Sequence, residues 1–165
     1  MFQVSLELPG DGPGIEYLLD RSFGPSRLDS AAYCLRADNP PLAELCFVIR
    51  ERGSLCAAIR YWQIMIAGNH PALLLGPLAV GQSWRGRGFG GALISHSLAR
   101  AKALGHGAVL VIGDPDYYRP FGFSASLAAN LELPKPAAPG CLQARELAPG
   151  ALSGRAGRLA VFVLE

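Results

Sequence analysis

Residues 85–91, Arg-Gly-Arg-Gly-Phe-Gly-Gly, combine four glycines with two arginines. Backbone without Cβ atoms can turn sharply and lets a ligand approach its N–H groups. An apolar run over 73–80 precedes the segment and a helical pattern follows it, so a helix should begin near its end. The first N–H groups of a helix are unpaired and carry a partial positive charge, which favours phosphate. The segment therefore predicts a binding site for a phosphorylated cofactor.

The glycine spacing alone is compatible with more than one interpretation. Gly86-x-Gly88-x-x-Gly91 fits the dinucleotide fingerprint of NAD-type oxidoreductases, and Asp114 follows the next predicted strand, where that fingerprint has a ribose-binding acid. The three strands predicted before the segment, and the short proline-rich chain after Asp114, argue against a dinucleotide-binding sheet. A P-loop is excluded because Ala92-Leu93 stands where Lys and Ser or Thr are required. A glycine-rich turn without a ligand is the remaining alternative.

The elements expected before this segment are two helices and a set of short strands. Hydrophobic periodicity and turn residues predict a strand over 2–8, helices over 15–19 and 28–37, and strands over 45–49, 55–66 and 72–80. The last three should form an antiparallel meander. Gly76-Pro77 lies inside the third of them and indicates an edge or a bulge, because proline lacks an N–H and glycine weakens pairing.

One long helix is expected to follow the glycine segment and to end at Gly105. Its predicted buried stripe consists of Leu93, Ile94, Ser97, Leu98, Ala101 and Leu104. A strand over 108–112 should lie parallel to 72–80, because a strand–helix–strand crossover is normally right-handed. Asp114 is expected to cap a short helix, and further strands are predicted near 121–123, over 141–148 and over 158–165.

Composition limits the class of protein. The 165 residues, of which half are hydrophobic and 17% charged, predict one folded domain over 1–165. A net charge of +2 without a Lys/Arg run gives no reason to expect nucleic acid. Four scattered cysteines without a CxxC pair predict neither a metal site nor a disulfide framework. The N-terminus lacks the pattern of a signal peptide and no run approaches a membrane span, so a cytoplasmic location is expected.

Two motifs together resemble the GNAT superfamily of acyl-CoA-dependent N-acetyltransferases. Residues 85–90 match the family's pyrophosphate motif, Gln/Arg-x-x-Gly-x-Gly/Ala, and Tyr118 stands four residues before the pair Gly122-Phe123, as in the family. The predicted order of strands and helices agrees over about residues 1–125. The Leu-Gly-Pro-Leu-Ala-Val strand and the Gly-Asp-Pro-x-Tyr-Tyr turn are similar to a bacterial branch of predicted acetyltransferases.

The resemblance implies a fold and a co-substrate. The fold would be a single α/β (α+β) domain with a mixed, mostly antiparallel sheet of six or seven strands, splayed in the middle and flanked by about four helices. The co-substrate would be acetyl-CoA, with no metal. Its binding residues would be the strand residues Leu78, Ala79 and Val80, the loop residues Arg85, Gly86, Arg87, Gly88, Phe89, Gly90 and Gly91, and Tyr117. Arg87 could equally be a solvated loop charge.

The resemblance also implies a reaction, the direct attack of an amine on the thioester. Tyr118 occupies the family position of the general acid, and a backbone N–H near Val80 would polarise the thioester carbonyl. Tyr117 is its neighbour, and the sequence does not decide which ring faces the sulfur. Candidates for the base are Glu44, Glu51, His70, Asp114 and Asp116.

The acceptor is expected to be a primary amine of a small molecule or a protein. Its pocket should be formed by residues 20–40 and the loops around 51 and 130–140. The proline-rich segment 134–139 suggests a lid, a linker or the contact of a homodimer. A CoA-binding module without catalytic activity is the alternative from another class, because no strand residue is an obvious base.

Overall fold

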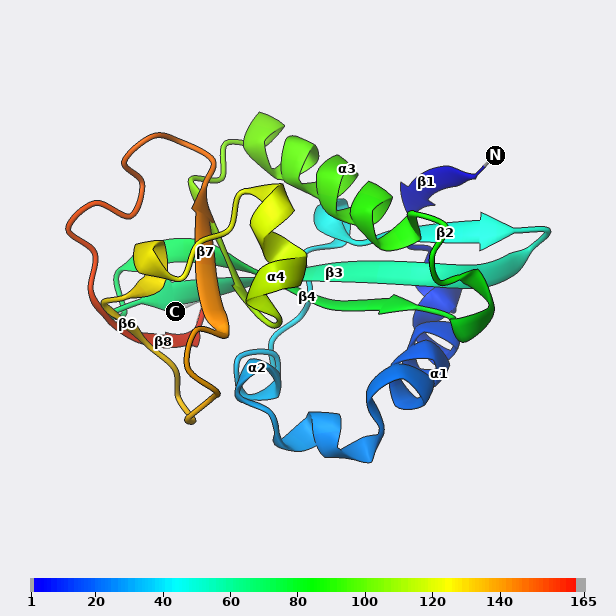
Figure 1. Cartoon of the computed structure of the whole chain (residues 1–165), viewed down its shortest axis with the longest axis horizontal. Coiled ribbons are helices and arrows are strands. Elements are labelled where there is room, and N and C mark those ends of the chain that lie inside the picture. Colours follow the sequence, from blue (N-terminus) through cyan, green and yellow to red (C-terminus); the bar gives the residue numbers. More distant parts are fainter. Residues whose placement is uncertain (1, 163–165) are drawn as a thin grey trace.

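The computed structural model describes residues 2–162, which form a twisted sheet with helices on both faces (Figure 1). The strands are β1 (Gln3–Leu6), β2 (Phe47–Glu51), β3 (Ser54–Ile66), β4 (His70–Val80), β5 (Ala108–Ile112), β6 (Leu131–Glu132), β7 (Leu142–Glu146) and β8 (Gly157–Val161). The α-helices are α1 (Gly12–Phe23), α2 (Ala31–Cys34), α3 (Phe89–Ala103) and α4 (Pro115–Tyr118). Six short 3-10 turns connect them.

The sheet is mostly antiparallel, as predicted, and has eight strands within residues 2–162. Its main path is β1-β2-β3-β4-β5-β7, and β8 joins the same edge of β3 beyond the end of β2. Only β4–β5 and β6–β8 are parallel. The parallel pair β4–β5 is joined by α3, which confirms the predicted crossover unit. Because no other strand pair is connected in this way, the sheet is unlike a doubly wound dinucleotide-binding sheet.

The centre of the sheet opens between β4 and β5. The two strands pair only where Leu73–Leu75 lie beside Val109–Val111, and the pairing stops at Gly76. Gly76-Pro77 is a cis peptide at a shift of register against β3, so the predicted bulge is confirmed. Gly76 has φ +121°, and its carbonyl accepts a hydrogen bond from the indole N–H of Trp62. Beyond this bulge, β4 runs on to Val80, and none of residues 2–162 pairs with it on the β5 side.

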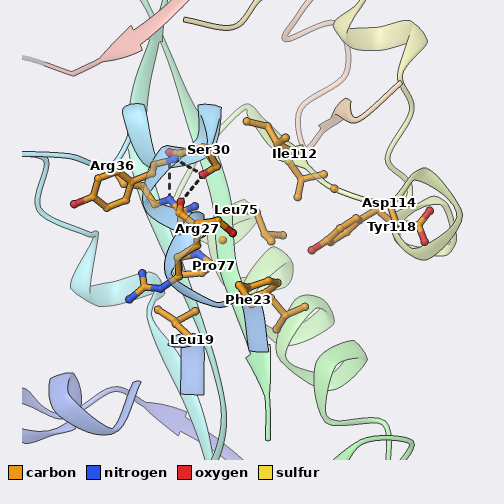
Figure 2. Close-up of a pocket in the computed structure, with 17 residues that line it drawn as sticks. Leu19, Phe23, Arg27, Ser30, Arg36, Leu75, Pro77, Ile112, Asp114 and Tyr118 are labelled. Carbon is orange, nitrogen blue, oxygen red and sulfur yellow. Dashed lines mark hydrogen bonds between the residues drawn. The ribbon is translucent and has the colours of Figure 1, made fainter. Parts of the chain in front are cut away.

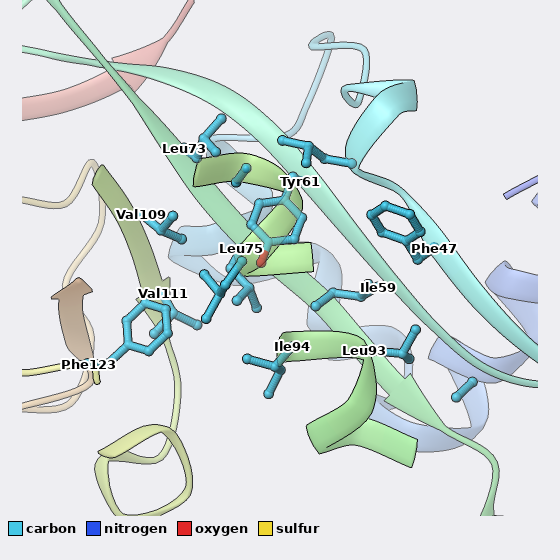
Figure 3. Close-up of a cluster of buried hydrophobic side chains, with 14 of the residues drawn as sticks. Phe47, Ile59, Tyr61, Leu73, Leu75, Leu93, Ile94, Val109, Val111 and Phe123 are labelled. Atoms are coloured by element: carbon cyan, nitrogen blue, oxygen red, sulfur yellow. The ribbon is translucent and has the colours of Figure 1, made fainter. Parts of the chain in front are cut away.

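Helices cover both faces of the sheet. On one face α3 packs Phe89, Leu93 and Ile94 into the largest buried cluster, together with Tyr61 of β3 (Figure 3). On the other face α1 packs Ile15, Leu18 and Leu19 against Val48, Ala58 and Ala79. The glycine segment therefore leads into a helix that is held by the core, while α1 stands across β4 from it (Figure 1).

Some of the predicted elements differ in the structure. Residues 28–37 do not form one helix, because Ser30 is extended (ψ 157°) and its side chain caps the four-residue α2 instead. Leu104 is 40% exposed because α3 ends at Ala103. Residues 121–123 turn through Gly122 (φ +87°) and form no strand, and the following Ser124 forms an isolated bridge with Ala144.

The two ends of the sheet also differ from the prediction. Within the predicted strand 2–8, β1 is shorter, and Leu6 and Leu8 are exposed. At the other end β8 covers 157–161, and residues 163–165 of the predicted strand lie outside the described residues. In the described part of the chain, none of the helices is long and apolar enough to cross a membrane.

A buried hydrogen-bond chain fixes α3 to the sheet. The hydroxyl oxygens of Tyr61 and Ser97 lie 2.8 Å apart, and the Ser97 hydroxyl donates to the Ile94 carbonyl at 3.1 Å. Since Ser97 uses its proton on Ile94, Tyr61 donates to Ser97. Both side chains are inaccessible to solvent.

We expect Ser97→Ala to lower the free energy of unfolding by about 1–3 kcal/mol, because it leaves the buried Tyr61 hydroxyl without an acceptor. Urea denaturation measures the change. Adding Tyr61→Phe should recover part of this loss, because the unpaired hydroxyl is then removed. Fully additive losses in the double variant would contradict the proposed hydrogen-bond chain.

Candidate active site

Two adjoining cavities lie where β4 and β5 separate. One, of about 570 Å³, is bordered by the end of β4 and the glycine segment; the other, of about 490 Å³, lies between β4, β5 and the chain from α1 to α2. Phe23, Leu78 and Tyr118 line both cavities. Figure 2 shows the second cavity, with Tyr118 extending from one wall and Leu19, Phe23 and Arg27 on the other. We call the first the loop cavity and the second the inner cavity.

The glycine segment presents a row of free backbone donors. Gly86 (φ +79°) and Gly88 (φ +81°) adopt left-handed conformations, which glycine tolerates best, and Gly88 is the N-cap of α3. The first backbone bond into the helix runs from the N–H of Ala92 to the Gly88 carbonyl. None of the N–H groups of residues 86–91 donates to another atom of the described chain. This arrangement, at the positive end of a helix, suits an anion.

The open side of β4 supplies further backbone groups. The Gly81 N–H donates to the Cys56 carbonyl at 2.7 Å, and antiparallel pairs alternate between bonded and non-bonded. Ala79, opposite Ala58, is therefore bonded to β3. Leu78 and Val80 direct their N–H and carbonyl groups away from β3, into the gap. Of the three predicted strand residues, these two offer backbone groups to a ligand, while Ala79 lines the loop cavity.

The two arginines of the glycine segment make different contacts. Arg85 lines the loop cavity, and its Nε donates to the Val80 carbonyl at 3.2 Å. Arg87 is outside that lining: it pairs with Glu51 at 2.9 Å, and its guanidinium lies 5.0 Å from the ring centre of Phe89. The predicted phosphate contact of Arg87 would require it to leave Glu51.

Tyr117 and Tyr118 occupy separate parts of the site. Of the two cavities, Tyr117 lines only the loop cavity. It lies so close to α3 that a methyl group on Gly90 would be 2.5 Å from its hydroxyl. Tyr118 lines both cavities and packs against Phe123 and Gly113. Burial, with a smaller contribution from Tyr117, raises the pKa of Tyr118 far above its ordinary value of 10.0, so the phenol is protonated at neutral pH.

Only one of the five base candidates borders either of these two cavities. Asp114 lines the inner cavity, and its carboxylate accepts the Asp116 N–H at 3.0 Å as the predicted cap of α4. Glu51 is paired with Arg87, and Asp116 with Arg119. His70 lies at the start of β4 and Glu44 in a 3-10 turn before β2, and neither lines a cavity. Within the described residues, no group of three His, Cys, Asp or Glu side chains could hold a metal ion.

The inner cavity contains polar residues that the sequence did not single out. Arg27, Ser30, Tyr33 and Arg36 line it from the chain between α1 and α2. They belong to the stretch 20–40 that the sequence predicts for the acceptor pocket. The loops around 51 and 130–140 do not line the cavity, although Lys135 Nζ donates to the Asp29 carbonyl at 3.3 Å. The acidic and basic residues of the stretch 20–40 are balanced, so the sequence did not single out any of its arginines. Only the folded chain shows which arginines are paired.

Comparison with known proteins identifies the family. Residues 13–123 match the sequence model of the Acetyltransferase (GNAT) family. The N-acetyltransferase YhbS of Escherichia coli K12 is 29% identical over 155 residues, which cover 93% of this chain and 92% of YhbS.

Solved structures agree with this assignment. A crystal structure of E. coli YhbS in complex with CoA has a TM-score of 0.83 at 28% identity, over 98% of this chain and 89% of that one. A GNAT acetyltransferase of Brucella melitensis in complex with acetyl-CoA has the same fold, with a TM-score of 0.71 at 24% identity, over 99% of this chain and 97% of that one. The family assignment overturns the dinucleotide-binding alternative. The splayed sheet, the unpaired N–H groups of the glycine segment and the family match agree, and the chain belongs to the GNAT family of acetyltransferases.

Proposed function

We propose that this protein transfers an acyl group from acetyl-CoA to a primary amine by direct attack on the thioester. The observation that carries the proposal is the run of unpaired N–H groups at residues 86–91, which opens onto the unpaired edge of β4. Membership of the acetyltransferase family and the CoA and acetyl-CoA complexes of the similar proteins support it.

The loop cavity is the proposed site of the co-substrate. The N–H groups of residues 86–91 would bind its pyrophosphate, and Arg85 would add a charge at the cavity wall. The pantetheine arm would lie along β4 as an added strand, bonded to Leu78 and Val80. Tyr117 would pack beside the pyrophosphate, because its hydroxyl is next to Gly90. This path leads the thioester to Tyr118, where the two cavities meet.

The inner cavity is the proposed site of the amine. The amine nitrogen forms a bond to the thioester carbon, and a free N–H of β4, at Leu78 or Val80, stabilises the oxyanion. The carbon–sulfur bond then breaks, and Tyr118 gives its proton to the leaving thiolate. The proton that the amine loses returns to Tyr118 through solvent, so the products are an amide and free CoA. Asp114 is the candidate that could accept the amine proton, directly or through water, because it alone of the five lines this cavity.

Several expectations from the sequence remain predictions. A single domain over 1–165, a cytoplasmic location, a homodimer, and a lack of nucleic-acid or membrane partners rest on composition and on the family. A primary amine as acceptor rests on the family's reaction.

Gly88→Glu should abolish acetyl-CoA binding in isothermal titration calorimetry, because its side chain blocks the backbone N–H groups and places a negative charge beside the pyrophosphate. Gly105→Glu is the matched control: Gly105 has φ +90°, and like Gly88 it faces open space, but it lies at the other end of α3. The control bears the same backbone strain and should bind normally. Wild-type affinity in Gly88→Glu would refute the pyrophosphate assignment.

Tyr118→Phe should lower kcat by about 10²-fold or more, with little change in KM for acetyl-CoA, because the thiolate loses its proton donor. CoA release in the presence of an amine panel provides the measurement. Tyr117→Phe, which removes the same atom in the loop cavity, should act on KM instead. Since burial raises the pKa of Tyr118, the wild-type kcat should not fall through loss of this proton below pH 10. An unchanged kcat in Tyr118→Phe would exclude its role as the acid; tight binding without turnover on any amine would favour a non-catalytic CoA-binding module.

A further inference from the structure

Arg36 is an unpaired cation on the wall of the inner cavity. Its Nε donates to the Ala32 carbonyl at 3.2 Å, and it has no carboxylate within ion-pair distance among the described residues. Its side chain is only partly accessible to solvent. Burial and, secondarily, the charge of Arg27 lower the pKa of Arg36 to about 10, which leaves the guanidinium protonated at neutral pH.

Three other arginines of this part of the fold are paired with carboxylates. Arg27 pairs with Glu16 at 2.6 Å and with Asp20 at 3.1 Å. Arg60 pairs with Glu7 at 2.7 Å, and Arg50 with Asp11. Arg36 differs from all three, although a partly buried charge is costly unless it is paired. Its remaining guanidinium N–H groups are therefore suited to an anion that comes from outside the chain.

The composition of the inner cavity restricts what that anion can belong to. The walls are otherwise largely apolar, with Leu19, Phe23, Pro77 and Ile112 around the opening of the sheet. Among the described residues, Asp114 is the only carboxylate that lines the cavity, on the wall that also carries Tyr118. A volume of about 490 Å³ is in the range of sites for small molecules. Arg36 and Arg27 lie on the opposite wall, toward α1 and α2 (Figure 2).

We infer that the acyl acceptor is a small amine that carries a carboxylate, with the carboxylate bound by Arg36 and the amine directed to Tyr118 and Asp114. This inference rests on the proposed function and names its substrate class. The uncompensated guanidinium of Arg36 repels an ammonium group, so a polyamine or an isolated alkylamine would not be held on that wall. A carboxylate is attracted there and matches the planar fork of a guanidinium, which also fixes which end of the molecule faces the thioester.

The inference can be tested with pairs of amines that differ only at the anion. Each proteinogenic amino acid is compared with its carboxamide, and phosphoethanolamine with ethanolamine, by CoA release from acetyl-CoA. We expect at least one amino acid to be acetylated with a kcat/KM about 10-fold or more above that of its carboxamide, the size expected for a charge-assisted hydrogen bond.

The Arg36→Gln variant should remove this preference. Its kcat/KM for the amino acid should fall about 10-fold or more through KM, its value for the carboxamide should stay near wild type, and its affinity for acetyl-CoA should not change. Arg36→Lys, which keeps the charge but not the fork, should be intermediate. Arg155→Gln is the control: it removes the same charge from an exposed loop residue outside both cavities.

The outcomes separate this inference from the proposed function. Turnover of amines with equal kcat/KM for each acid and its carboxamide would overturn the inference and leave the acetyltransferase activity intact. A preference for phosphoethanolamine alone would also overturn the carboxylate assignment. Failure to bind acetyl-CoA would overturn the proposed function itself.

In that last case the carboxylate site is still tested directly. Calorimetric titration of the wild type and Arg36→Gln with the N-acetylated amino acids needs no turnover. Binding that depends on Arg36 would support the carboxylate site, and binding of none of them by the wild type would reject it. A fall in melting temperature common to Arg36→Gln and Arg36→Lys, with an unchanged preference for the acid, would assign Arg36 a structural role at α2.

Discussion

The end of pairing between β4 and β5 at Leu75 is the constraint on which the rest of the site depends. Two parallel strands in contact would use the backbone groups of Leu78 and Val80 on each other. The bulge at Gly76-Pro77 ends that pairing, and proline cannot donate a ladder hydrogen bond in any case. The fold tolerates the opening because β3 pairs with the whole of β4, and because α1 and α3 cover the two faces at the same point.

Unsatisfied groups in this protein gather at the opening. Among the described residues, the N–H groups of residues 86–91 have no acceptor, the end of β4 has no partner strand on the β5 side, and Arg36 has no carboxylate within ion-pair distance. By contrast, Arg60 is paired with Glu7 and Arg50 with Asp11. The proposed ligands would complete the structure at this opening, where both cavities lie.

The sequence was most informative where the site comes from one continuous stretch. Residues 72–91 contain a strand, a glycine turn and a helix start, so local rules predicted the long strands, the bulge, the free N–H groups and α3. Prediction failed where tertiary context decides. Ser30 caps α2 instead of continuing a helix over 28–37. The predicted buried stripe included Leu104, which lies beyond the end of α3 and is exposed. The positions of Tyr117 and Tyr118 could be separated only by the contacts of their rings.

The inner cavity could not be predicted from the sequence, for a different reason. Its walls come from α1, the turns around α2, β4 and β5, which are distant in the chain, and each wall contributes only a few residues. Arg27 and Arg36 have the same side chain and lie nine positions apart, yet Arg27 is neutralised by Glu16 and Asp20 while Arg36 is not. That difference depends on how α1 packs against the next turn. The proposed co-substrate site therefore follows from a local motif, whereas the proposed acceptor specificity depends on ion pairs that form only in the folded chain.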